Sequence, residues 1–407
     1  MFFKNILRFG VLVFFVSAIL PFLLLSRPLC RLRFGTMYTQ RFGQLAINAD
    51  IFLRNFQLST FPSRTFYFFF GWNPVNRQLM EMWKRQKNYP VRFIESRIGT
   101  KIMFVLRNLL QSTGFWESAK DTALEYYLYN NSKPVLSFTQ EEEQKGKAFL
   151  QKMGISETDW FVCFHARDDN YFQTWSPELK KIWKKTSFRS ISIENYSKAA
   201  EYIASQGGYA IRYGANAGKP FNTTENAKIL DYSSNYRDDF MDIYLVAKCR
   251  FFLGCCSGPL ALATAFNTPT ISVNHLPYNY GYYKTNNFDN DIFVQRLIVN
   301  PKNKTEIVPF WKAKKKGYFS REKGEPLSQF DNMFDTLETE SDDILDACKD
   351  MIEALNGITI SDEAKKIQNI YAETYLSCIE EYKYSAKIGP RFGLKYRDLI
   401  IPPIETR

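Results

Sequence analysis

A repeated alternation of short apolar runs and helical segments between residues 161 and 274 constrains the fold of this chain more than any other feature. The run Phe161-Val-Cys-Phe-His165 is apolar up to its last residue, as in a strand that is buried on both faces. After it, the pattern predicts strands at 209–212, 250–254 and 270–274, and helices at 193–205, at 239–248 and around Pro259. Such alternation favours parallel β-α-β units, so the sequence predicts an α/β fold with a doubly wound sheet.

Regular patterns also flank this core. Thr139 and Glu142 have the spacing of a capping box, which predicts a helix that ends near Met153. The other expected elements are strands at 65–70 and 89–94, a helix that Asn73 caps and that runs to about Lys87, and C-terminal helices at 341–356 and 362–383. Residues 40–150 are therefore expected to form a smaller α/β region, whose first strand the pattern does not locate.

Positive charge is concentrated near the N-terminus. The 407 residues have a formal net charge of +11, and the first 110 hold sixteen Lys and Arg against three Asp and Glu. Such an excess suits nucleic acid, anionic lipid or a phosphorylated acceptor. No nucleic-acid-binding motif accompanies it, so we expect no nucleic-acid partner.

The chain has seven cysteines, without a C-x-x-C pair, and only two histidines. These counts disfavour a disulfide framework and a multi-histidine metal site.

Phe9 to Leu25 is a run of 17 uncharged, mostly apolar residues. As a helix, at about 1.5 Å per residue, it would reach roughly 25 Å, the short limit for crossing a bilayer. No small-residue cleavage site follows it, because the next residues are Ser26, Arg27 and Pro28. The heavier positive flank lies downstream, which favours a cytoplasmic body. The sequence thus predicts an uncleaved anchor or a docking helix at the inner membrane.

Polar residues follow the strands of the predicted sheet, at the edge where doubly wound sheets bind ligands. They are His165, Arg167, Asp168 and Asp169 after the first strand, Arg212 after the second, Ser257 and Gly258 after the third, and Asn274 and His275 after the last. Two arginines beside a helix N-terminus suit a diphosphate, because a guanidinium donates paired hydrogen bonds to phosphate oxygens. The same side chains could also be ordinary loop residues, with Arg167 pairing with Asp169.

Four segments form longer motifs. They are Arg41-Phe-Gly-Gln-Leu45, His165-Ala-Arg167-Asp168, the Y-x-x-A-x-x-Y-I-x-x-Q-G-G-Y-x-I-R stretch at 196–212 and the F-M-D-I-Y-L-x-A-K-C-x-F-F-x-G-x-x-S-G segment at 240–258. In these motifs the chain resembles, from about residue 38 to 390, a family of bacterial glycosyltransferases. More distantly it resembles fucosyltransferase-like enzymes of the two-domain GT-B fold. It departs from the family pattern at Gln44, where histidine is usual, and at Cys255 and Cys256.

The resemblance implies two Rossmann-like domains and a metal-independent transfer of sugar from a nucleotide-diphosphate donor, with no cofactor besides that substrate. By this analogy Arg167 and Arg212 hold the donor phosphates and Ser257 and Gly258 offer backbone N–H groups; His165 and Asn274 are further donor-site candidates. The implied organisation is an anchor at 1–35, an acceptor-side domain at 36–155, a nucleotide-sugar domain at 156–335 and C-terminal helices packing back on the body at 336–407.

An inverting transfer would need a group that accepts the proton of the acceptor hydroxyl. Asp168 and Asp169, next to the expected phosphate site, are the candidates. Because the basic first domain lies beside the membrane segment, we expect an acceptor that carries negative charge, such as a polyprenyl-diphosphate-linked sugar or another bacterial surface-glycan precursor.

Other classes of protein share some of these features. Gly254-x-Cys256-x-Gly258 matches a nucleophile elbow with cysteine in place of serine, and His275 could be its base in a thiol hydrolase or amidotransferase. Asp289-Asn-Asp291 matches the D-x-D that holds a metal in the other main glycosyltransferase fold. A non-catalytic, membrane-associated binding protein is the remaining class.

Overall fold

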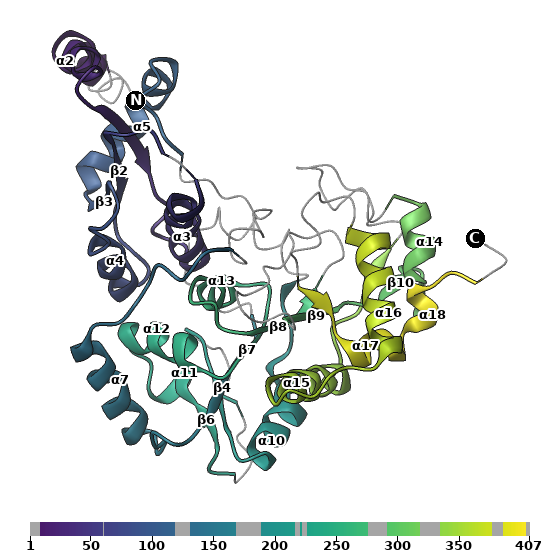
Figure 1. The fold of residues 1–407 in the computed structure, drawn as a ribbon. Helices are drawn as coiled ribbons and strands as arrows, with labels where there is room; N and C mark the ends of the chain where they lie inside the picture. The colour runs from purple at the N-terminus through teal and green to yellow at the C-terminus, as the bar shows by residue number, and fades with distance from the viewer. Residues whose placement is uncertain are drawn as a thin grey trace. The chain divides into compact units, whose positions relative to one another are not determined.

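The computed structural model describes residues 9–59, 61–118, 131–167, 189–215, 220–221, 226–275, 291–317, 334–376 and 386–403. The chain divides into two compact units. One is made of Met1–Thr122 and Ser132–Ser137, and the other of Ala123–Asn131 and Phe138–Arg407. Each unit has its own parallel sheet with helices around it (Figure 1). The predicted α/β class, with an apolar N-terminal helix and C-terminal helices, is therefore confirmed.

The first unit has a sheet of three described strands in the order β1-β2-β3, all parallel. The strands are β1 (Arg31–Thr36), β2 (Thr65–Gly71) and β3 (Val91–Glu95), and the helices are α3 (Phe42–Leu58), α4 (Arg77–Lys84) and α5 (Arg97–Ser112). Phe69 and Trp83 are fully buried between sheet and helices. A buried ion pair between Arg54 and Asp50 extends to Ser132, which ties that segment to this unit.

An apolar helix over Phe9–Ser26 precedes this sheet and includes η1 (Phe15–Ile19) and α2 (Leu20–Ser26). Among the described residues it alone is long and apolar enough to cross a membrane, with a mean hydropathy of 2.5. Its buried side chains, Phe15 and Leu23, form a cluster with Leu106 and Leu110 of α5. Most of its remaining large apolar side chains are exposed, namely Phe9, Val13, Phe14, Val16, Ile19, Phe22, Leu24 and Leu25. The helix thus has one face attached to the unit and a wide apolar face that nothing described covers.

The start of α4 differs from the sequence prediction. Asn76 is the N-cap, and its side chain accepts a hydrogen bond from the backbone N–H of Leu79 at 2.8 Å. Asn73, the expected cap, has a φ of 51° and lies in the turn after β2. The two asparagines are three residues apart in Asn73-Pro-Val-Asn76, and only backbone conformation decides which one caps.

The sequence pattern does not locate β1. This strand alternates arginine with apolar residues and so lacks a continuous apolar signal.

The second unit is built on seven described strands in the order β13-β9-β8-β7-β4-β5-β6, with every neighbouring pair parallel. They are β4 (Phe161–His165), β5 (Tyr209–Arg212), β6 (Ile229–Asp231), β7 (Phe252–Cys255), β8 (Thr270–His275), β9 (Ile292–Gln295) and β13 (Lys387–Ile388). From β4 the chain first moves outward to β5 and β6, and then returns to add β7, β8 and β9 on the other side. This is the doubly wound order 3-2-1-4-5-6, and the predicted sheet is confirmed.

Helices cover both faces of this sheet (Figure 1). α10 (Ser197–Ser205), α12 (Asp239–Lys248) and α13 (Gly258–Ala265) fall within or close to the predicted ranges. Right-handed crossovers that run in opposite directions from β4 place α10 on one face and α12 and α13 on the other. The capping box of Thr139 and Glu142 is confirmed at the start of α7 (Gln140–Lys152), which contacts α12.

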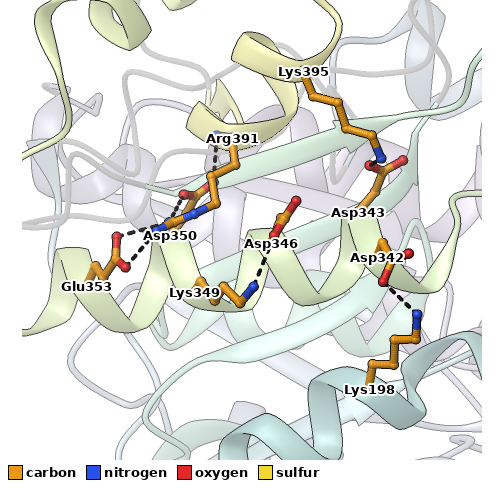
Figure 2. Close-up of polar contacts among 9 residues, drawn as sticks. All are labelled: Lys198, Asp342, Asp343, Asp346, Lys349, Asp350, Glu353, Arg391 and Lys395. Atoms are coloured by element: carbon orange, nitrogen blue, oxygen red, sulfur yellow. Dashed lines mark hydrogen bonds and ion pairs between the residues drawn. The ribbon is translucent and has the colours of Figure 1, made fainter.

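Within the second unit, ion pairs connect the C-terminal helix α15 (Ser341–Leu355) to α10 and to α17 (Pro390–Lys395). The other C-terminal helices are α16 (Asp362–Tyr371), η5 (Ala372–Leu376) and α18 (Arg397–Ile400). Figure 2 shows acidic residues of α15 bound to basic residues of α10 and α17. The pairs are Asp342 with Lys198 at 2.7 Å, Asp343 with Lys395 at 2.6 Å, and Glu353 with Arg391 at 2.7 Å, while Asp350 also contacts Arg391. This network attaches α15 to the sheet's helix layer on one side and to the C-terminal segment on the other.

Smaller elements complete the second unit. They are α11 (Tyr232–Asn235), α14 (Phe310–Lys315), η3 (Ile193–Tyr196) and an antiparallel sheet of β10 (Ile298–Asn300), β11 (Asn303–Ile307) and β12 (Asp335–Thr336).

Candidate functional site

The order of the large sheet creates a topological switch point between β4 and β7. β4 is followed in the sheet by its neighbour β5 on one side, and β7 by its neighbour β8 on the other, so the connections from these two adjacent strands lead in opposite directions. A crevice forms at such a point, outside the carboxyl ends of the strands, and it is where open α/β sheets bind ligands. Here Arg167 follows β4 and the turn Cys255–Gly258 follows β7. The backbone N–H of Arg167 donates to Sγ of Cys255 at 3.3 Å, which joins the two strand ends.

The turn after β7 leads directly into α13, which begins at Gly258. Ser257 is the N-cap, but its hydroxyl donates to the carbonyl of Cys255 at 3.0 Å and does not cap the helix. Pro259 has no N–H, so the donors of the first turn that no described residue caps are the backbone N–H groups of Gly258 and Leu260. These donors and the positive end of the helix dipole favour an anionic group at this position.

A second arginine, which the sequence analysis does not single out, lies at the same turn. Nη1 of Arg189 is 3.9 Å from Sγ of Cys256, and the buried Nε of Arg189 has no hydrogen-bond partner among the residues that the structure describes. Burial raises the pKa of the Cys255 thiol to about 11, although the backbone N–H of Arg167 and the charges of Arg167 and Arg189 act in the opposite direction. Both guanidinium groups are therefore close enough to act electrostatically on this turn. Arg189 lies in the polar stretch 166–192, where no sequence pattern distinguishes it.

Arg212 has a different environment. Its Nη1 donates to Oδ2 of Asp231 at 3.0 Å, and both side chains are buried between β5 and β6. Burial raises the pKa of Asp231, but hydrogen bonds from the Phe221 N–H and Ser233 and the charge of Arg212 hold it below its usual value. The pair is thus a structural ion pair of the sheet edge, and contact of Arg212 with a donor phosphate stays a prediction.

His165, at the end of β4, lies beside the segment that follows β5. Its Nδ1 is 3.0 Å from the carbonyl oxygen of Tyr213. Because a carbonyl only accepts, Nδ1 carries the proton in this contact, and Nε2 is the basic nitrogen of the neutral ring. Gly214 lies against the ring and has a φ of 156°, and a Cβ there would be 3.3 Å from Nδ1. The imidazole is therefore held in one orientation at the strand end.

Asn274, the last of the predicted donor-site residues that the structure describes, is buried and has a φ of 58°. Its Nδ2 donates to the carbonyl of Ser190 and its Oδ1 accepts from Nη1 of Arg296, both at 2.9 Å, while its N–H donates to Thr339 at the same distance. The contact with Ser190 holds the residue next to Arg189. Asn274 thus positions the arginine segment, and direct contact with a donor stays a prediction.

The predicted catalytic residues Asp168 and Asp169 lie outside the described residues. Of the D-x-D motif, Asp289 does so too, whereas Asp291 is fully buried at the start of β9. Its Oδ1 accepts the N–H of Thr270 at 2.7 Å, at the edge of the sheet opposite the carboxyl ends of the strands. Among the described residues, no three His, Cys, Asp or Glu side chains lie together so that they could hold a metal ion.

Cys256 and His275, the pair that a thiol mechanism would need, lie in different environments. Burial lowers the pKa of His275 well below its usual value, and its ring packs on Phe293 with the ring centres 5.0 Å apart. Cys256 is partly exposed and contacts Arg189. His275 is thus held as a neutral, interior side chain.

Comparison with known proteins gives distant likenesses only. Neither a protein-family model nor a curated protein matches the chain. Among solved structures, a glycosyl transferase family 9 protein from Veillonella parvula is 10% identical, with 66% of this chain and 86% of that chain covered at a TM-score of 0.39. The ADP-heptose LPS heptosyltransferase II of E. coli is 12% identical (60% and 84% covered, TM-score 0.37). The iron-containing dodecameric glycosyltransferase TibC of enterotoxigenic E. coli is also 12% identical (63% of each chain, TM-score 0.34). The strand order of the large sheet, independent of these likenesses, defines the doubly wound fold.

Proposed function

We propose that this protein is a glycosyltransferase that moves a sugar from a nucleotide-diphosphate donor to a bacterial surface-glycan or lipid-linked acceptor. The observation that carries the proposal is the switch point between β4 and β7, where Arg167 and Arg189 meet the uncapped start of α13. A diphosphate placed there would receive guanidinium and backbone N–H donors together.

This arrangement suits the chemistry of sugar transfer. The bond from the sugar to the diphosphate breaks, and negative charge develops on the departing phosphate oxygen. Fixed donors that face this oxygen stabilise the transition state without reorganising. In the proposed mechanism Arg167, Arg189 and the N–H groups of Gly258 and Leu260 provide that stabilisation, so the transfer is metal-independent.

The acceptor hydroxyl must lose a proton during the transfer. Asp168 and Asp169 remain the candidates from the sequence. The structure adds His165, because its Nδ1–H is committed to the Tyr213 carbonyl and Nε2 is the nitrogen that accepts a proton. We propose that one of these three groups is the general base of the reaction.

The proposed acceptor lies at the cytoplasmic face of the inner membrane. The support is the exposed apolar face of the helix Phe9–Ser26 and the excess of Lys and Arg in the first unit. A basic surface next to a bilayer favours acceptors with phosphate groups. In the proposal the first unit receives the acceptor and the second unit binds the donor, as in GT-B enzymes.

A binding screen tests the function. Full-length protein in non-ionic detergent is titrated with UDP-, GDP-, ADP- and CMP-sugars, ADP-heptose included, and then with the matching nucleoside diphosphates. We expect one nucleotide to bind, and we expect Arg167→Gln and Arg189→Gln each to lower the affinity for it. Arg397→Gln, at an exposed position of α18, is the matched control for loss of one charge. Failure of every nucleotide sugar to bind a folded protein contradicts the proposal, and binding without transfer to any glycan acceptor supports a non-catalytic protein.

A further inference from the structure

A hollow of about 430 Å³ lies in the first unit, where the N-terminal helix ends and β1 begins. Its lining includes Arg27, Arg31, Arg33, Gly114 and Phe115. We call it the arginine pocket. Its volume falls within the range of small-molecule sites, roughly 300–1,000 Å³. It is separate from the proposed donor site, which belongs to the second unit.

The local structure brings the three arginines together. Arg31 and Arg33 are two residues apart in β1, so their side chains lie on the same face of the strand. Arg27 is the C-cap of α2, and its guanidinium stacks on the ring of Phe115 at 4.5 Å. Three guanidinium groups from two consecutive elements therefore face one hollow.

Two of these cations are fixed before any ligand binds. Arg27 donates to the carbonyl of Thr113 and Arg33 donates to the carbonyl of Gly114, both at the C-terminal end of α5. Helix C-termini carry partial negative charge, which favours cations there. Each guanidinium has five N–H donors, so these bonds leave donors for a ligand. The pocket is thus preorganised, which lowers the entropic cost of binding an anion.

Within the described residues the charge of the pocket is only partly balanced, because the one acidic side chain nearby, that of Glu117, acts with Arg33 on the pKa of Tyr67. No acidic side chain lines it, and in the part of the chain that the structure describes none of the three arginines forms an ion pair with Asp or Glu. The buried arginines Arg54 and Arg212 differ, because each pairs with an aspartate. Three like charges that face one hollow repel one another, and a bound anion would relieve that repulsion.

We propose that the arginine pocket binds the phosphate of an anionic membrane lipid. The pocket begins at the residue that follows Phe9–Ser26, so a bilayer that takes up the exposed face of this helix places the pocket at headgroup level. Leu25 and Leu29, 78% and 72% exposed, flank Arg27 and would contact acyl chains at the same depth. Binding of a free anion would explain why arginines line the pocket, but it would not explain why two exposed leucines lie beside it. Lipid binding at this pocket does not depend on the proposed sugar transfer.

Calorimetry on the full-length protein in non-ionic detergent tests the proposal. The ligands are short-chain phosphatidic acid, short-chain phosphatidylcholine and inorganic phosphate. We expect saturable binding of phosphatidic acid and at least tenfold weaker binding of the other two. Arg31→Gln should lower the affinity for phosphatidic acid about tenfold, which is the effect of losing one charge-assisted hydrogen bond. Arg31 is chosen because its exposed side chain makes no bond to the end of α5. Arg92→Gln, exposed in β3 outside the pocket, should leave the affinity unchanged.

The outcomes separate the lipid from other anions. Equal affinity for inorganic phosphate and phosphatidic acid would overturn the lipid assignment. Unchanged affinity in Arg31→Gln and in a second variant, Arg27→Gln, with circular dichroism unchanged, would remove the pocket as the site. Nucleotide-sugar binding by Arg31→Gln is measured in parallel and should equal that of the wild type, so the two proposals fail independently.

Discussion

Arg167 and Cys255 are residues 88 positions apart whose backbone N–H and thiol sulfur lie 3.3 Å from each other. This contact joins the ends of the two central strands at the switch point. It also keeps Arg167 beside the turn that starts α13, the turn that Arg189 contacts, so that in the proposed site both arginines act on one ligand.

For donor affinity, the geometry of the arginine side chains at this site should matter more than their charge. Arg167→Lys and Arg189→Lys should each weaken donor binding, because lysine cannot donate the paired hydrogen bonds of a guanidinium. We expect a cost of about 1–3 kcal/mol, roughly 5- to 150-fold in affinity. Donor titration of both variants measures it. Wild-type affinity in both, with thermal unfolding unchanged, would exclude these side chains from the site.

Arg212 should be mainly a stability residue. Replacement by Met leaves the carboxylate of Asp231 buried without its cation, and breaking one side of a buried ion pair costs about 3–5 kcal/mol. Urea unfolding measures this change. If Arg212→Met is as stable as the wild type and has lost donor binding, the residue contacts the phosphates instead, as the sequence motif implies.

The turn 254–258 separates the two enzyme classes. In a phosphate-binding turn, Cys256→Ala retains most activity, whereas Gly258→Val blocks the approach of the diphosphate and abolishes donor binding. A nucleophilic Cys256 reverses this result and reacts selectively with iodoacetamide. Activity, donor affinity and thiol labelling are measured on both variants. An inactive Cys256→Ala protein that still binds donor would contradict the glycosyltransferase proposal.

Asp242 should make stability depend on pH near neutrality. Burial raises its pKa to about 7, against the charge of Arg237 and a hydrogen bond from Tyr232. Between about pH 4 and 7 the folded protein therefore binds a proton that the unfolded chain has released, and stability falls as pH rises through this window. In Asp242→Asn this contribution is absent. As the pH rises through the window, the free energy of unfolding of the variant should therefore increase relative to that of the wild type, by at most about 1.4 kcal/mol per pH unit. Urea unfolding at pH 5, 6, 7 and 8 measures the difference. A constant difference across these pH values would contradict the assignment.

Membrane attachment should depend on the exposed face of the N-terminal helix. Truncation at Thr36 would also remove β1, so substitution is the sharper test. Phe14→Glu combined with Phe22→Glu should release the protein to the soluble fraction, because both rings are exposed and outside the core cluster. High salt should not release the wild type, since apolar burial is not screened. Ser17→Glu on the same helix is the control for one added charge. Equal membrane fractions for all three proteins would contradict the anchor.

The second unit was more predictable from sequence than the first, for a physical reason. Strands buried on both faces, such as Phe161–His165, are continuous apolar runs, and the helices between them carry clear caps and ends. β1 has arginines on one face, so its sequence lacks that signal. The strand ends that carry Arg167 and Ser257 were predictable from sequence, whereas the roles of these residues stay predictions. The place of Arg189 was not predictable, because it depends on long-range contacts such as that between Asn274 and Ser190.

The seventh strand of the large sheet has a consequence for biosynthesis. β13 comes from residues 387 and 388 and pairs with β9, whose last residue is 295. During translation about 90 further residues must therefore emerge before that edge is covered, and an uncovered parallel edge is a template for misassembly. The N-terminal helix and first sheet leave the ribosome long before this. If the proposed anchor is correct, its insertion into the bilayer begins while the second unit is unfinished, and a stop codon shortly before residue 387 should yield membrane-bound, aggregation-prone chains.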